Sequence, residues 1–241
     1  MSHSKWFLLL SFLALPLAPV HAELLHKSAN IGGTVVEYDV VLPTGYMPGR
    51  EYPAILAFGG GPQDEEIDQR IIESNFRPLA ERRGYIVVMP AAPGGELFFQ
   101  GGQRVIPGFL QRVMSDYRIQ GGKFRIAGPS NGGISAFEVA AQFPQYFTSI
   151  TAFPGFLEFP TPENVKAISR MCIHMFVGQY DELNFLPPMQ QLAEELRRRH
   201  LAVTYRVEPG QSHRIASLAG DGAAQMFDQF DQDPHGCVKD R

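Results

Sequence analysis

The segment from Gly128 to Gly133, with the sequence GPSNGG, carries the pattern in this chain that most clearly indicates chemistry. An apolar run ends at Ala127 just before it, and an alanine-rich helical pattern follows. Ser130 is therefore predicted to lie on a tight turn from a strand into a helix, the position of an activated serine nucleophile. Strand and helix crowd together at such a turn, and Gly128 and Gly132 supply the small residues it needs.

A serine hydroxyl is a poor nucleophile at neutral pH, so this chemistry needs other groups. A neutral imidazole must take the hydroxyl proton as the oxygen attacks an acyl carbon, and must return it to the leaving group. A buried carboxylate must hold that imidazole in the correct tautomer. Backbone amides must stabilise the negative oxygen of the tetrahedral intermediate. Without these partners, the segment is an ordinary glycine-rich turn.

Apolar runs typical of strands alternate with helical segments along the rest of the chain, which predicts an α/β fold with a mainly parallel sheet. With 241 residues, 44% of them hydrophobic, the chain can bury the core of a single domain, predicted over residues 23–241. The expected strands are 34–42, 54–58, 85–89, 124–127, 148–153, 172–177 and 203–207. The expected helices are 65–83, 105–117, 131–143, 186–199 and 215–230.

Over nearly its whole length the chain resembles the α/β-hydrolases, and among them the compact secreted esterases of the polyhydroxybutyrate-depolymerase, feruloyl-esterase and dienelactone-hydrolase-like groups. The resemblance implies helices on both faces of the sheet and a chain order of serine, acid and histidine. Little or no lid is expected, because residues 154–170 leave space for only a short loop, and no cofactor is expected, because serine, imidazole and backbone amides suffice for the chemistry. Asp181 follows the strand 172–177, and His213 lies in the loop after the strand 203–207. Both match that order, so Asp181 is the expected orienting carboxylate and His213 the expected general base for Ser130.

These two assignments have alternatives. Asp181 would also fit a helix cap or a surface turn, with the neighbouring Glu182 as the acid. Among the other histidines, His200 ends a charged helix and His235 lies in the C-terminal tail, so neither is favoured as the base. His174 lies inside an apolar strand and is predicted to be a hydrogen-bonded core histidine.

Two backbone amides are expected to form the oxyanion hole. One is the amide of Asn131, next to the nucleophile. The other is expected from the loop Gly59–Gly61, where missing side chains let the backbone approach a substrate. The resemblance favours Gly60 as the donor, although Phe58 stands where the family motif has histidine.

Aromatic residues in two loops are the candidates for substrate binding. Residues 154–170 leave space for only a short loop, so the site is expected to be open. Phe153 and Phe156 border or lie in this loop, and Phe98 and Phe99 lie in the other long loop. An apolar or aromatic acyl group would pack against them. The alternative for each is that it closes the rim of the core.

The first 22 residues are predicted to be a signal peptide. Lys5 precedes the apolar stretch 6–15, and a small-residue cleavage pattern ends at Ala22. The alternative is a membrane anchor, for which the stretch is short. We therefore expect a periplasmic or extracellular protein with no stable membrane anchor after cleavage.

The charge and the cysteine content indicate which binding partners and metal sites are not expected. The net charge is −4, and the run Arg197–Arg199 fits a solvated helix end, so nucleic acid is not an expected partner. Cys172 and Cys237 lack the spacing of a metal site, and no metal is expected. In an exported protein they would form one disulfide or remain two thiols, and the sequence leaves both open.

Three functions fit these residues. The favoured one is a carboxylic ester hydrolase acting on a small-molecule or polymer-linked ester. A serine peptidase of the prolyl-oligopeptidase-like type shares the fold, but it usually carries an added domain that orients peptides. A non-catalytic binding protein on a hydrolase scaffold would be expected to have lost part of the triad, whereas all three residue types are present.

Overall fold

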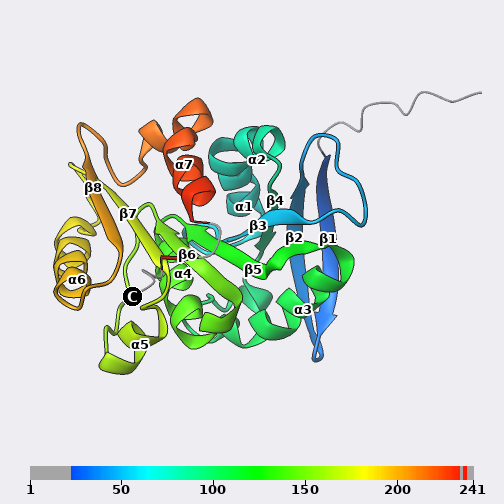
Figure 1. Ribbon diagram of the computed structural model, residues 1–241, viewed down its shortest axis with the longest axis horizontal. Coiled ribbons are helices and arrows are strands. Elements are labelled where there is room, and N and C mark those ends of the chain that lie inside the picture. Colours follow the sequence, from blue (N-terminus) through cyan, green and yellow to red (C-terminus); the bar gives the residue numbers. More distant parts are fainter. Residues whose placement is uncertain (1–22, 234–235, 238–241) are drawn as a thin grey trace, which may run out of the picture.

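The computed structural model describes residues 23–233 and 236–237. The predicted signal peptide, residues 1–22, and His235 lie outside the described residues. Figure 1 shows a twisted central sheet with helices packed on both of its faces.

Eight strands form this sheet in the order β1-β2-β4-β3-β5-β6-β7-β8. β2 pairs antiparallel with both β1 and β4, and every other neighbouring pair is parallel. The strands are β1 Glu23–Ile31, β2 Thr34–Leu42, β3 Tyr52–Ala57, β4 Ile86–Pro90, β5 Ile119–Gly128, β6 Phe147–Ala152, β7 Cys172–Gly178 and β8 Val203–Glu208. The predicted α/β fold with a mainly parallel sheet is confirmed.

The helices cover the two faces in separate groups (Figure 1). One face carries α1 (Glu65–Ile71), the π-turn η1 (Ile72–Phe76), α2 (Arg77–Arg83) and α7 (Ala224–Gln232). The other carries α3 (Ile106–Asp116), α4 (Asn131–Gln142), α5 (Pro162–Ala167) and α6 (Leu186–Arg198). No helix in the described ranges is both long enough and apolar enough for a bilayer crossing.

Two apolar cores hold these layers together, one on each face of the sheet. Ala54 and Leu56 of β3 point into the core beneath α3, α4 and α6, whereas Ile55 and Ala57 point into the core beneath η1, α2 and α7. Successive residues of a strand face opposite sides, so a central strand covered on both sides must be apolar at every position. This requirement explains the continuous apolar run that made β3 predictable.

The structure contains one strand that the sequence analysis did not predict. β1 is largely exposed and rich in polar residues, so it lacks the apolar pattern of the inner strands. It pairs with β2 through a two-residue turn in which Gly32 and Gly33 both have positive φ, at 59° and 92°. This left-handed conformation suits a hairpin turn and favours glycine.

Two segments differ from the prediction. Residues 154–170, expected to be a short loop, contain the short helix α5. The segment 215–230 begins with two 3-10 turns, Ala216–Leu218 and Gly220–Ala223, before α7 starts. Gly220 has a φ of 56°, a conformation that an α-helix cannot continue through.

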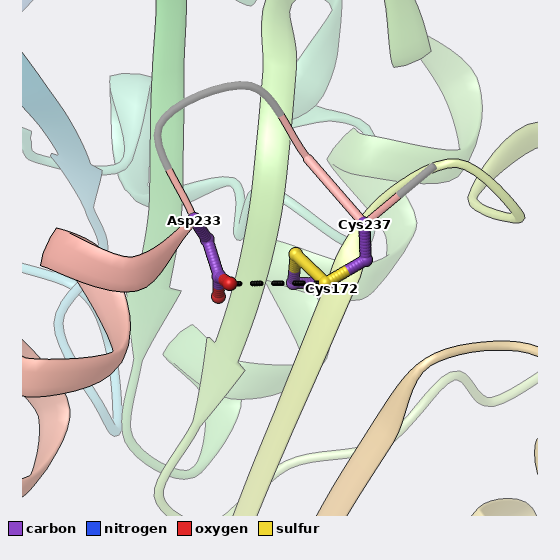
Figure 2. A group of neighbouring side chains, drawn as sticks. All are labelled: Cys172, Asp233 and Cys237. Atoms are coloured by element: carbon purple, nitrogen blue, oxygen red, sulfur yellow. Dashed lines mark hydrogen bonds between the residues drawn. A yellow bond between two sulfur atoms is a disulfide. The ribbon is translucent and has the colours of Figure 1, made fainter. Parts of the chain in front are cut away.

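A disulfide joins Cys172, at the start of β7, to Cys237 near the C-terminus, with Cα atoms 4.9 Å apart. Figure 2 shows this pair beside Asp233, whose Oδ1 lies 3.7 Å from Cys237 Sγ. Within the described part of the chain, these three residues form the one group of potential metal ligands whose atoms lie within 4.8 Å of one another. The two sulfurs are bonded to each other, so the group forms a covalent link between β7 and the C-terminal segment. Closing a loop of 65 residues stabilises the fold by up to about 4 kcal/mol.

Candidate active site

Ser130 lies between the end of β5 and the start of α4, with φ 56° and ψ −125°. This strained backbone projects a side chain at the carboxyl edge of the sheet. A Cβ atom on Gly128 would lie 2.6 Å from the carbonyl carbon of Gly132, and one on Gly132 would lie 2.5 Å from the carbonyl oxygen of Gly59. Neither position has space for a side chain, as the sequence analysis expected.

The loop after β8 brings His213 to this turn. His213 Nε2 lies 2.9 Å from Ser130 Oγ, and His213 Nδ1 lies 2.8 Å from Asp181 Oδ2. The Asp181 side chain has no exposed surface, and that of His213 is 10% exposed. The structure thus brings the three predicted residues together in one hydrogen-bonded chain, although 83 residues separate Ser130 from His213. This arrangement can move a proton from a hydroxyl to a ring nitrogen and stabilise the resulting imidazolium.

The two neighbouring acids take different positions. Asp181 Oδ1 accepts hydrogen bonds from the amides of Leu183 and Phe185, which fix the carboxylate while its other oxygen contacts the imidazole. Glu182 instead accepts the backbone amide of His213 at 3.0 Å, and this hydrogen bond lowers the pKa of its carboxyl. Asp181 therefore caps the turn with one carboxylate oxygen and contacts the His213 ring with the other, so the two alternatives for this residue do not exclude each other.

The glycine loop after β3 lies beside the nucleophile. A Cβ atom on Gly60 would lie 3.6 Å from Ser130 Cβ, so the Gly60 backbone lies beside the Ser130 side chain. The side chain of Asn131 donates to the carbonyl of Gly61 at 2.8 Å and ties the loop to α4. Asn131 is the first residue of α4, where a backbone N–H has no acceptor within the helix.

Phe98 and Phe153, two of the four aromatic residues expected to bind substrate, lie in the core. Phe98 has no exposed surface and packs on Phe58, with ring centroids 4.7 Å apart. Phe153 is 3% exposed and packs on Phe76. Side chains with so little accessible surface do not offer a face to a substrate in this conformation, so both match the alternative, in which they belong to the core.

Phe156 and Phe99 are half-buried. Phe156 packs edge-on against Phe185 at 5.3 Å, and Phe185 in turn packs against the His213 ring at 4.8 Å. Phe185 was not among the predicted site residues. One feature of the sequence could have indicated that Phe185 lies at the site, namely its position four residues after Asp181. Its backbone amide donates a hydrogen bond to Asp181 across this spacing.

His174 lies in the core, as predicted, and its Nε2 pairs with the buried carboxylate of Asp233. Its Nδ1 has no hydrogen-bond partner among the described residues. His200 lies at the exposed end of α6. The triad geometry involves neither of these histidines.

The carboxyl of Asp68, in α1, is buried behind the glycine loop. The residue is 1% exposed, and a Cβ atom on Gly59 would lie 1.9 Å from its Oδ1. Burial raises the pKa of this carboxyl from 3.8 to about 8, and the charges of Asp39, Asp64 and Glu65 add to the increase. The nearby Gly59 amide opposes part of it, without forming a hydrogen bond of normal geometry to either oxygen. Asp68 is thus mainly protonated at neutral pH.

This burial predicts a pH-dependent effect on stability. The native state holds a proton that the unfolded chain releases, so the free energy of unfolding falls as pH rises from 3.8 through about 8. Asp68→Asn cannot ionise, and we expect it to raise the free energy of unfolding by about 2 kcal/mol near pH 8.5. At roughly 2 to 4 °C per kcal/mol, thermal melts should show an increase in Tm of about 5 °C. Near pH 4 the increase should vanish.

Glu66→Gln provides the matched control because it removes the same charge from a side chain of the same helix that is 83% exposed. We expect its Tm to follow that of the parent protein at both pH values. An Asp68→Asn gain of equal size at both pH values would contradict the assigned protonation.

No model of a known protein family matches the chain. The sequence is 30% identical over 151 residues to dipeptidyl-peptidase 5 of Porphyromonas gingivalis, covering 58% of this chain and 22% of that protein. The structure is similar to a thermostable esterase, with a TM-score of 0.67 and 16% identity over 87% of this chain and 63% of the esterase. It is also similar to the feruloyl esterase module of Clostridium thermocellum complexed with sinapinate, with a TM-score of 0.66 and 16% identity over 99% of both chains. The chain therefore has the α/β-hydrolase fold, and it spans about a fifth of the curated relative that it matches.

Proposed function

We propose that this protein is an exported serine hydrolase that cleaves carboxylic esters through an acyl-enzyme on Ser130. The observation that carries the proposal is the continuous chain of hydrogen bonds from Ser130 Oγ through the imidazole of His213 to Asp181. A disulfide agrees with export, because such bonds persist in oxidising compartments.

In the proposed reaction, Ser130 Oγ forms a bond to the acyl carbon as its proton passes to His213 Nε2. The amides of Gly60 and Asn131 donate to the oxyanion. The intermediate collapses, the bond to the alcohol oxygen breaks, and His213 returns the proton to that oxygen. Water then attacks the acyl-enzyme by the same route, which releases the carboxylic acid and restores the serine. Asp181 stabilises the imidazolium in both halves.

The substrate is proposed to be a small-molecule or polymer-linked ester. Phe156 and Phe185 extend from the His213 ring as a half-buried aromatic surface on which an apolar group can pack. The fold neighbours described as esterases agree with this substrate class.

Peptidase activity is the second candidate, and the likeness to dipeptidyl-peptidase 5 is the observation that favours it. The same triad can cleave an amide, so the triad geometry does not separate the two activities. The distinction depends on how the substrate is held.

A direct comparison of substrates tests the proposal. We expect kcat/KM for p-nitrophenyl butyrate to exceed that for a dipeptidyl p-nitroanilide by at least about 100-fold, because an ester is a better acyl donor than an anilide and the aromatic surface beside His213 suits an apolar group rather than a peptide amine. Methyl ferulate serves as an aromatic ester in the same panel. Faster turnover of the dipeptide anilide would establish the peptidase instead, and turnover of neither, without labelling by a fluorophosphonate, would favour a binding protein.

A further inference from the structure

Gln63 is a fully buried polar residue beside the glycine loop, and it has no part in the reaction steps proposed above. Its Nε2 donates to the carbonyl of Gly59 at 3.2 Å and to Ser135 Oγ at 2.9 Å. Its Oε1 accepts the amide of Phe98 at 3.0 Å. The orientation of the side-chain amide is fixed by chemistry, because a backbone carbonyl only accepts and a backbone N–H only donates. Both ends of the Gln63 amide are therefore satisfied in the interior, where an unpaired amide is costly.

The backbone of Gln63 is held as firmly as its side chain. Its amide donates to the carbonyl of Gly60 at 3.0 Å, and its carbonyl accepts the amide of Ala92 at 2.7 Å. Its φ of 55° is in the left-handed region, which costs a residue with a Cβ atom roughly 1 kcal/mol or more. The surrounding hydrogen bonds keep it in this unfavourable conformation.

These contacts join three parts of the site. Gly59 belongs to the glycine loop, Ser135 lies in α4 behind the nucleophile, and Phe98 packs on Phe58 at the end of β3. The carbonyl of Gly59 and the N–H of Gly60 belong to the same peptide unit. A peptide unit is planar, so a hydrogen bond that fixes the direction of its carbonyl also fixes the direction of its N–H.

We propose that Gln63 is a positioning residue for the oxyanion hole, setting the Gly59–Gly60 peptide plane so that the Gly60 N–H points to the position of the oxyanion. Its second bond, to Ser135, couples that plane to α4, the helix that begins directly after Ser130. The inference rests on the proposed function, because only acyl transfer makes use of the Gly60 N–H. A small rotation of a preorganised donor is costly, since its value depends on direction at the moment when charge develops.

The test is Gln63→Met, which keeps the length of the side chain and removes its three side-chain hydrogen bonds. Active sites are first counted by complete labelling with a fluorophosphonate, so that misfolded protein is excluded. We expect kcat for p-nitrophenyl butyrate per labelled site to fall roughly 10- to 100-fold, with KM changed less than about twofold. Affinity for a trifluoromethyl ketone, which forms a tetrahedral adduct, should fall by the same factor as kcat/KM.

Asn75→Leu is the matched control, because Asn75 is also a buried amide bonded to a carbonyl, that of Leu218 at 2.9 Å. We expect it to lower Tm and to leave kcat per labelled site unchanged. A Gln63→Met protein with parental kcat per site would overturn the inference, as would an equal loss of kcat in Asn75→Leu. If Gln63→Met does not fold, Ser135→Ala replaces it, with an expected loss in kcat of about threefold. Unchanged kcat in Ser135→Ala would then overturn the inference.

The two levels of the proposal fail differently. A parent protein that neither turns over esters nor reacts with the fluorophosphonate would refute the proposed function itself. An active parent with an equally active Gln63→Met variant would refute only the role of Gln63.

Discussion

Replacing Ser130 with alanine is expected to lower kcat for ester hydrolysis by about a million-fold and to abolish labelling by a fluorophosphonate. The hydroxyl oxygen is the atom that would form the acyl-enzyme, and the hydroxyl lies within hydrogen-bond distance of His213 Nε2, which would accept its proton. No neighbouring group takes over this covalent step. Labelling followed by intact-protein mass spectrometry, together with burst kinetics on p-nitrophenyl butyrate, measures both effects.

Ser115→Ala is the appropriate control because Ser115 is an exposed serine of α3. It should label and turn over ester at the parental rate. Persistent labelling of Ser130→Ala would move the nucleophile to another residue, and the proposed mechanism would then be wrong.

Asp181→Asn is expected to cause the second largest loss, about 10,000-fold in kcat. The buried carboxylate contacts His213 Nδ1, and an amide there neither stabilises the imidazolium nor holds the ring in the same tautomer. Steady-state kinetics on p-nitrophenyl butyrate, with Tm recorded in parallel, separates this loss from unfolding.

Glu182→Gln provides the comparison within the same turn. Glu182 accepts the backbone amide of His213, and a glutamine oxygen can still accept that bond. We expect kcat to change by less than about threefold. In free energy, such a change is smaller than the contribution of one ordinary hydrogen bond. A severe loss in Glu182→Gln with a mild one in Asp181→Asn would reverse the assignment of the acid.

The local sequence determined most of the elements and the position of the candidate nucleophile. β2 occupies residues 34–42, the range predicted, and α4 begins at Asn131 as expected. Apolar periodicity and glycine spacing are local properties, so a short window of sequence contains them. β1 lacked such a pattern because an exposed edge strand needs few apolar residues; its place comes from pairing with β2.

Only the tertiary structure decided which residues meet. It separated Asp181 from Glu182 by the direction of adjacent side chains, placed Phe98 and Phe153 in the core, and brought Phe185 to His213. It also joined the two cysteines and enclosed Gln63 among three segments. Each of these outcomes depends on contacts between residues far apart in the chain or on the direction of a loop backbone. Long-range contacts and loop directions leave no periodic pattern in the sequence, because they are set by how the helices pack on the folded sheet.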